Sequence, residues 1–253
     1  MNQPVKWVAE LSGVQEISIL GIADLGFWKQ RLRRSGLIPA ERDGHAQIMI
    51  IAASATFAGI KFRELSFSVL AANPSGAIGR DSAYLEHAFN SCRFFALCER
   101  VFYSTPYRHA DVRLAGTFPA SIELVAQGRI AFQARMQVTT PAGSRAPSSR
   151  GDDGWQGAVF LPEPNDRRPP RWNLFFARIH GFTERYPFLP SHDYLTIQPI
   201  SGPPPVLQAL LDSSFLATEW LCREKATHSK SKTYSANELV NLAAPAHPGP
   251  ARD

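Results

Sequence analysis

One glutamate lies where a strand pattern would hold a carboxylate against apolar side chains. Glu64 shares one face of an alternating segment with Phe62, Ser66 and Leu70. A carboxylate between two apolar side chains, with the Ser66 hydroxyl beside it, can have a raised pKa and act as a general acid or base. The alternative is a surface glutamate on an edge strand, or one paired with an arginine. Glu64 is therefore a candidate catalytic residue.

A second candidate group follows a helix-ending proline, Pro106. Arg108 can anchor a carboxylate, an enolate or a phosphate, and its alternative role is a structural ion pair. Tyr107 can donate a hydrogen bond to a substrate oxygen or simply pack. In an extended segment, His109 would point away from Arg108.

Motifs for nucleotides, hydrolytic nucleophiles and metals are absent from the sequence. It contains no G-x-G-x-x-G, G-x-x-x-x-G-K-[ST], G-x-S-x-G or H-E-x-x-H pattern. Cys92 and Cys98 lack the spacing of a zinc site, and the seven histidines are scattered. We therefore expect neither a cofactor nor a metal.

Composition is typical of a globular protein. Of 253 residues, 44% are hydrophobic and 19% charged, and the longest apolar run, 48–53, is far shorter than the ~18 residues of a membrane helix. No secretory signal opens the chain, and three cysteines fit a reducing compartment, so we expect a cytoplasmic protein without a membrane partner. Residues 222–233 supply +3 of the net charge of +5, and the remaining charges are mixed, so we expect no nucleic-acid partner.

Hydrophobic periodicity predicts many strands and few helices without strand–helix alternation. The fold class is therefore α+β, antiparallel and β-rich, with one domain at 1–233 and a flexible, proline-rich tail at 234–253. Short helices are expected after Asp24, in the second half of 83–103, and at 205–212. Strands are expected at 14–22, 46–58, 61–72, 111–117, 121–126, 129–139, 155–161, 172–182, 192–200 and 215–224.

Three stretches, taken in order, resemble the acetoacetate decarboxylase superfamily. They are a strand–helix opening at 14–36, a Gly-x-x-x-x-Glu segment at 59–64, and the stretch 96–114. The resemblance implies an acetoacetate decarboxylase-like barrel or cone with a few short helices, and a homo-oligomer. It also implies that Glu64 lies in the pocket and that the turn at 106–108 lies over the same face, so we predict that Glu64 and Arg108 face one pocket.

The same resemblance shows where this chain departs from the family pattern. The family's Schiff-base lysine and its neighbouring lysine fall on Tyr107 and Arg108, and its carboxylate-orienting arginine falls approximately on Gln15. Neither a phenol nor a guanidinium can form an imine with a ketone. Lys61 would lie on the opposite strand face from Glu64, and no lysine occurs between positions 62 and 224, so we expect no other lysine in the core.

The resemblance therefore implies a diverged enzyme that works without a Schiff base. Acid–base or electrostatic catalysis would carry out an isomerisation, cyclisation, dehydration or aldol-type step on an apolar small molecule with a carbonyl or carboxylate, in secondary metabolism. Glu64, Tyr107 and Arg108 would be catalytic, and Phe62, Ser66 and Gln15 would contact the substrate. The alternative is a non-catalytic small-molecule binding protein on the same fold.

Overall fold

The computed structural model describes residues 4–72, 82–115, 119–140, 143–162, 173–199, 205–235 and 238. The three helices of this part are α1 (Leu25–Leu32), α2 (Arg93–Phe102) and α3 (Val206–Asp212), and a 3-10 turn, η1 (Arg33–Ser35), follows α1. The strands are β1 (Trp7–Asp24), β2 (Ile38–Pro39), β3 (Glu41–Arg42), β4 (His45–Phe57), β5 (Ile60–Ala72), β6 (Ser82–Asn90), β7 (Tyr107–His109), β8 (Asp111–Ala115), β9 (Ser121–Ala126), β10 (Arg129–Arg135), β11 (Thr139–Thr140), β12 (Gly143–Ser144), β13 (Ser149–Phe160), β14 (Asn173–Pro187), β15 (Tyr194–Ile197), β16 (Leu216–Ser231) and β17 (Tyr234–Ser235).

Seven strands close into a barrel. Their hydrogen-bonded order is β5-β4-β1-β16-β14-β13-β6, and β6 pairs with β5 to complete the ring. Neighbours are antiparallel except β13 and β6, which run parallel, and the short β7 pairs parallel with the far end of β6. Closure leaves the seven long strands without free edges and creates an inside face that alternates with the outside face along each strand.

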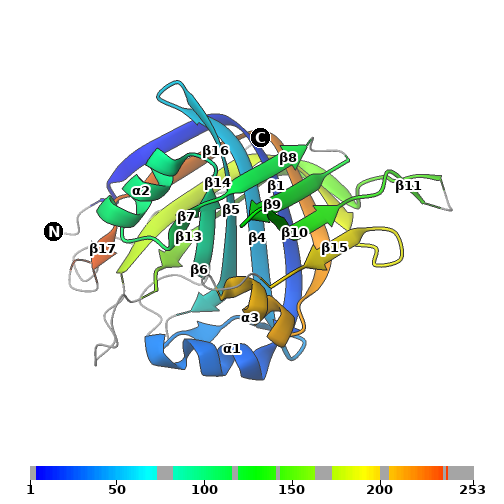
Figure 1. The fold of residues 1–253 in the computed structure, drawn as a ribbon, viewed down its shortest axis with the longest axis horizontal. Coiled ribbons are helices and arrows are strands. Elements are labelled where there is room, and N and C mark those ends of the chain that lie inside the picture. Colours follow the sequence, from blue (N-terminus) through cyan, green and yellow to red (C-terminus); the bar gives the residue numbers. More distant parts are fainter. Residues whose placement is uncertain are drawn as a thin grey trace, which may run out of the picture.

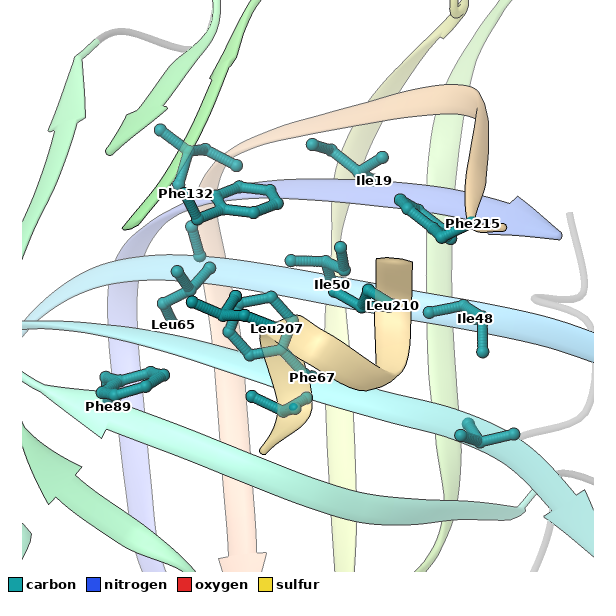
Figure 2. Close-up of a cluster of buried hydrophobic side chains, with 14 of the residues drawn as sticks. Ile19, Ile48, Ile50, Leu65, Phe67, Phe89, Phe132, Leu207, Leu210 and Phe215 are labelled. Carbon is teal, nitrogen blue, oxygen red and sulfur yellow. The ribbon is translucent and has the colours of Figure 1, made fainter. Parts of the chain in front are cut away.

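The main hydrophobic core lies outside this barrel, beneath a second layer. A four-stranded sheet in the order β15-β10-β9-β8, together with α3, covers one side of the long strands (Figure 1). Between the layers, Phe67 of β5 meets Phe132 of β10 edge to face at a centroid distance of 5.6 Å. Leu207 and Leu210 of α3 project into the same cluster (Figure 2). Since this core fills the space outside the barrel, the inside face is free to line a site.

Two β-bulges change which residues of β1 and β16 point into the barrel. Between Leu11 and Val14 of β1 an extra residue is accommodated at Gly13, which has φ +68°. In β16 the register shift places Arg223 opposite Glu16 but Ala226 opposite Val14, with Lys225 at φ 56° between them. Each bulge inserts one residue and so reverses the alternation of side chains that follows it. In both strands the residues that point into the barrel have odd numbers before the bulge and even numbers after it.

The fold class predicted from the sequence is confirmed, because strands dominate, neighbouring strands are mainly antiparallel and the helices are few and short. Helix α1 begins as expected, with Asp24 accepting a hydrogen bond from the Phe27 amide, and α3 lies at the predicted place. The helix expected in the second half of 83–103 is α2, whereas 83–90, where no strand was expected, belongs to β6, and β13 and β16 are longer than predicted.

The predicted start of the C-terminal tail needs a correction. Tyr234 is 3% exposed, packs against Phe176, and accepts a hydrogen bond from the Lys6 amide on its hydroxyl at 2.6 Å. β17 pairs with β14, so positions 234 and 235 belong to the folded domain. Residues 236–237 and 239–253 of the expected tail lie outside the described residues. In the described part of the chain, every helix is too short or too polar to cross a lipid bilayer.

Candidate functional site

A cavity of about 170 Å³ lies inside the barrel. All seven barrel strands contribute to its wall, and α2 and β7 close one side. Most of the wall is apolar, including Met49, Ile51, Trp155 and Phe175. Its polar side chains are Glu64, Ser66, Ser68, Glu99, Tyr107, Arg178, His228, Ser229 and Lys230. A mainly apolar pocket with a few convergent ionisable groups is typical of a small-molecule site.

Glu64 and Tyr107 form the first ionisable pair of the cavity. The Tyr107 hydroxyl donates a hydrogen bond to Glu64 Oε2 at 3.2 Å. Burial, and secondarily the nearby Glu99 carboxylate, raise the pKa of Glu64 above its ordinary 4.5, although His228, Lys230 and the Tyr107 hydrogen bond oppose this rise. Burial and the same two carboxylates also raise the pKa of Tyr107 well above 10. Glu64 is therefore placed to exchange a proton with a ligand in the cavity, while Tyr107 remains a neutral donor.

Lys230 and Glu99 form the second pair, on the side of the cavity next to α2. The Lys230 ammonium makes an ion pair with Glu99, which also accepts a hydrogen bond from the Thr105 hydroxyl at 3.0 Å. Two aromatic faces, those of Tyr103 and Phe175, each lie 4.6 Å from Lys230 Nζ. The carboxylate and the rings all interact favourably with the positively charged form of the amine.

The expectation of no further lysine in the core is therefore wrong. It rested on the lysine-free interval from 62 to 224 and left Lys230, which follows that interval, out of account. Instead, β16 continues to Ser231, and its bulge turns His228 and Lys230 into the barrel. Between Lys225 and Lys232 only Ala226 is apolar, so no apolar–polar alternation in the sequence marks this continuation of the strand.

His228 belongs to a third group that extends from the cavity to the buried side chain of Glu16. His228 Nε2 lies 2.6 Å from Glu16 Oε2, and the Ser18 hydroxyl donates to Glu16 Oε1 at 2.7 Å. The Arg223 guanidinium pairs with the same carboxylate and donates to the Thr183 hydroxyl at 2.7 Å. Burial alone would raise the pKa of Glu16, but His228, Arg223 and Ser18 together lower it to about 2. Glu16 thus remains ionised and fixes the orientation of the His228 ring at the cavity wall.

Three of the six predicted site residues line the cavity, namely Glu64, Ser66 and Tyr107. Phe62 lies beside it in a separate buried cluster, where it packs against Phe95 at a centroid distance of 5.2 Å. Gln15 is opposite Ser54 in the pairing of β1 with β4, on the face that points away from the cavity.

Arg108 does not face the cavity, so the prediction that it shares a pocket with Glu64 is wrong. Tyr107 and Arg108 are consecutive in a strand and therefore point to opposite faces. Arg108 is exposed on the outer side, next to His87, whose pKa is lowered to about 3 by burial and then by the arginine. The cation that faces Glu64 is instead supplied by β16.

A metal site is not evident in the part of the chain that the structure describes. In this part, no group of three or more His, Cys, Asp and Glu side chains is arranged to hold a metal ion. Of the ionisable groups in the cavity wall, Glu64 bonds to Tyr107, Glu99 to Lys230, and His228 to Glu16 behind the wall.

Comparison with solved structures identifies the architecture. No protein-family model matches the sequence, and no curated protein matches it. The structure is similar to the acetoacetate decarboxylase of Legionella pneumophila, with a TM-score of 0.62 and 12% identity over 91% of this chain and 89% of that chain. It is also similar to an acetoacetate decarboxylase-like enzyme from Sphingomonas wittichii RW1, with a TM-score of 0.55 and 14% identity over 89% of this chain and 91% of that chain.

A further solved acetoacetate decarboxylase has a TM-score of 0.57 and 12% identity over 92% of this chain and 90% of its own. The chain therefore has the fold of the acetoacetate decarboxylase-like superfamily, as the sequence resemblance predicted. At this level of identity the likeness concerns the fold, and the chemistry depends on the side chains of the cavity.

Proposed function

We propose that the protein is an enzyme that uses Glu64 for proton transfer on an apolar small molecule with a carbonyl or carboxylate. The observation that carries this proposal is the Glu64–Tyr107 pair inside an apolar cavity, with Lys230 and His228 in the same wall. A carboxylate with a raised pKa is a better base near neutral pH than an exposed one.

The proposed step is removal of a proton from the carbon next to a carbonyl group. Glu64 accepts the proton, and the electron pair moves into the carbonyl to give an enolate. Tyr107 donates a hydrogen bond to the enolate oxygen, and the positive charge of Lys230 stabilises it. Return of the proton from Glu64 at another position gives an isomer. If Glu64 instead gives the proton to a departing β-hydroxyl, the C–O bond breaks and water leaves. If the enolate attacks a second carbonyl, Glu64 gives the proton to the new alkoxide and an aldol product forms.

The proposal excludes an imine on Lys230 as the catalytic intermediate. An amine attacks a carbonyl carbon only through its neutral lone pair. Glu99 and the two aromatic rings that contact Lys230 interact with its ammonium form, so the side chain serves as a fixed positive charge.

A second candidate, the non-catalytic binding protein, has one observation in its favour. Each ionisable group discussed above already has a protein partner: Glu64 with Tyr107, Glu99 with Lys230, and Glu16 with His228. A satisfied polar network of this kind can also hold a rigid pocket without doing chemistry.

Deuterium exchange separates the two functions. The protein is incubated with acetylacetone or phenylacetone in D₂O, and deuterium at the α-carbon is followed by NMR, while Trp155 in the cavity wall reports binding by fluorescence. The enzyme should accelerate exchange, and Glu64→Gln should lower that rate at least ~100-fold with binding retained. Glu41→Gln, an exposed glutamate on β3, is the control and should leave the rate unchanged. If the protein binds both ketones without accelerating deuterium exchange in either, the binding-protein function is favoured. If Glu64→Gln exchanges deuterium as fast as the unchanged protein, Glu64 is excluded as the base.

A further inference from the structure

Helix α2 carries large apolar side chains on the face that points away from the barrel. Phe94, Leu97, Val101 and Phe102 are exposed, with Phe102 at 73% and Phe94 at 62%. The first three are spaced by three and four residues, so they form one ridge along the helix. The opposite face of α2 is buried at Ala96 and contributes Glu99 to the cavity.

The turn that joins β4 to β5 extends this apolar surface. Phe57 and Ile60 at the turn are 42% and 43% exposed. The Phe57 ring meets Phe95 of α2 at a centroid distance of 6.1 Å, and Phe62 meets Phe95 from the same hairpin. Figure 1 shows α2 and this hairpin together at one edge of the molecule. We call the six exposed side chains the α2 surface: Phe57, Ile60, Phe94, Leu97, Val101 and Phe102.

The exposed charges of these two segments are all basic. Lys61 and Arg63 follow the turn, and Arg93 and Arg100 lie seven residues apart along one border of the helical ridge. Glu99 is the acidic residue of the two segments, and it faces the cavity, where it pairs with Lys230. The α2 surface is therefore an apolar ridge with a cationic border.

We propose that the α2 surface docks on an anionic lipid membrane. A helix with an apolar face and basic flanks lies in the membrane interface, with its apolar side chains among the acyl chains and its cations at the headgroups. Association of two copies through this surface would bring the four basic residues of each copy toward those of the other, which like-charge repulsion opposes. An anionic bilayer removes that repulsion and covers the apolar ridge at the same time.

The proposal departs from the expectation of no membrane partner, which rested on the lack of a long apolar run, because a peripheral contact needs no spanning segment. Because α2 separates the docked surface from the cavity, an apolar ligand dissolved in the bilayer would be concentrated at the wall of the barrel. The docking itself is independent of the catalytic role proposed for Glu64, and its test uses no substrate.

Vesicle flotation tests the proposal directly. The full chain is mixed at low ionic strength with vesicles of phosphatidylcholine alone or of phosphatidylcholine with one quarter phosphatidylglycerol. We expect binding to the anionic vesicles only, with loss of binding as salt is raised. The double variant Arg93→Gln/Arg100→Gln should bind about 25-fold more weakly, at about fivefold per charge removed. Phe94→Ser/Phe102→Ser should weaken binding more than tenfold.

The matched control changes two equally exposed apolar residues on other elements, Phe182→Ser/Leu216→Ser, and should bind as the unchanged protein does. All variants alter exposed side chains, and their thermal midpoints show that the fold is kept. The proposal is overturned if the unchanged protein fails to float with anionic vesicles, if it binds neutral vesicles equally well, or if the control variant loses as much binding as Phe94→Ser/Phe102→Ser. Sedimentation velocity then shows whether the α2 surface instead joins two copies of the chain.

Discussion

The buried carboxylate of Glu16 gives the sharpest test of how this barrel is held together. Glu16 is fully buried and pairs with Arg223 and His228 inside the barrel. Its pKa is lowered from 4.5 to about 2, which corresponds to about 3 kcal/mol of preferential interaction with the ionised form. Because the folded-state pKa lies below the unfolded-state value, this stability is fully present above pH 4.5 and is lost as the pH falls toward 2.

Glu16→Gln should therefore lower the free energy of unfolding by about 3 kcal/mol at pH 7. The substitution keeps the size of the side chain but leaves the buried Arg223 guanidinium without its carboxylate. The unchanged protein itself loses about 1 kcal/mol of this contribution by pH 4 and about 2 kcal/mol by pH 3. The difference between protein and variant should thus shrink to about 1 kcal/mol at pH 3.

Urea unfolding followed by tryptophan fluorescence at pH 7, 4 and 3 measures this difference. Taking the difference between protein and variant at each pH removes the contributions of the other carboxylates. Glu41→Gln, in an exposed pair with Lys29, is the control and should change the free energy by less than about 0.5 kcal/mol at every pH. A loss from Glu16→Gln that stays constant from pH 7 to pH 3 would refute the assigned pKa shift, and a loss below about 1 kcal/mol at pH 7 would refute the buried pairing.

Three further outcomes follow from the same structure. Acetoacetate with borohydride should leave the intact mass unchanged, since Glu99 holds the Lys230 ammonium, and a reduced adduct on Lys230 would contradict this. A chain that ends at Thr233 should lose about 3 kcal/mol of stability relative to one that ends at Glu238, because it lacks the buried Tyr234 ring; equal urea midpoints would show that the ring contributes little. Arg108→Ala should leave the affinity for cavity ligands within about twofold, as titrated by Trp155 fluorescence, and a tenfold loss would place Arg108 in the site after all.

Local patterns were sufficient to predict the elements whose signals lie within a few residues. Asp24 with Leu25, Trp28 and Leu32 specifies α1 because the cap and the apolar spacing coincide. The alternation in β5 placed Glu64 and Ser66 on the inside face correctly, since the strand has no bulge between them.

The alternation of side chains along a strand also explains why only part of the candidate site could be predicted. Tyr107 and Arg108 are neighbours on an extended segment, and strand alternation allows one of them, not both, to face Glu64. Lys230 could not be placed from its own segment, because its direction depends on a bulge near Lys225 and on a partner bulge in β1 more than 200 residues away in sequence. Pairings between distant segments carry no local sequence signal.

The closed barrel also explains how a cavity can change its chemistry while the fold is kept. Every long strand presents alternate side chains to the same interior, so a cation can enter from β16 as readily as from the segment that follows α2. The strand that supplies a charged side chain then matters less for the chemistry of the cavity than the point on the barrel wall at which that side chain enters it. Here the acid Glu64, the phenol Tyr107 and the amine Lys230 come from three different strands and meet in one apolar space. A substitution in any of the three should therefore alter the properties of the other two, so the loss of exchange in Glu64→Gln should exceed what its effect on Tyr107 and Lys230 explains, and double variants of the three measure that coupling.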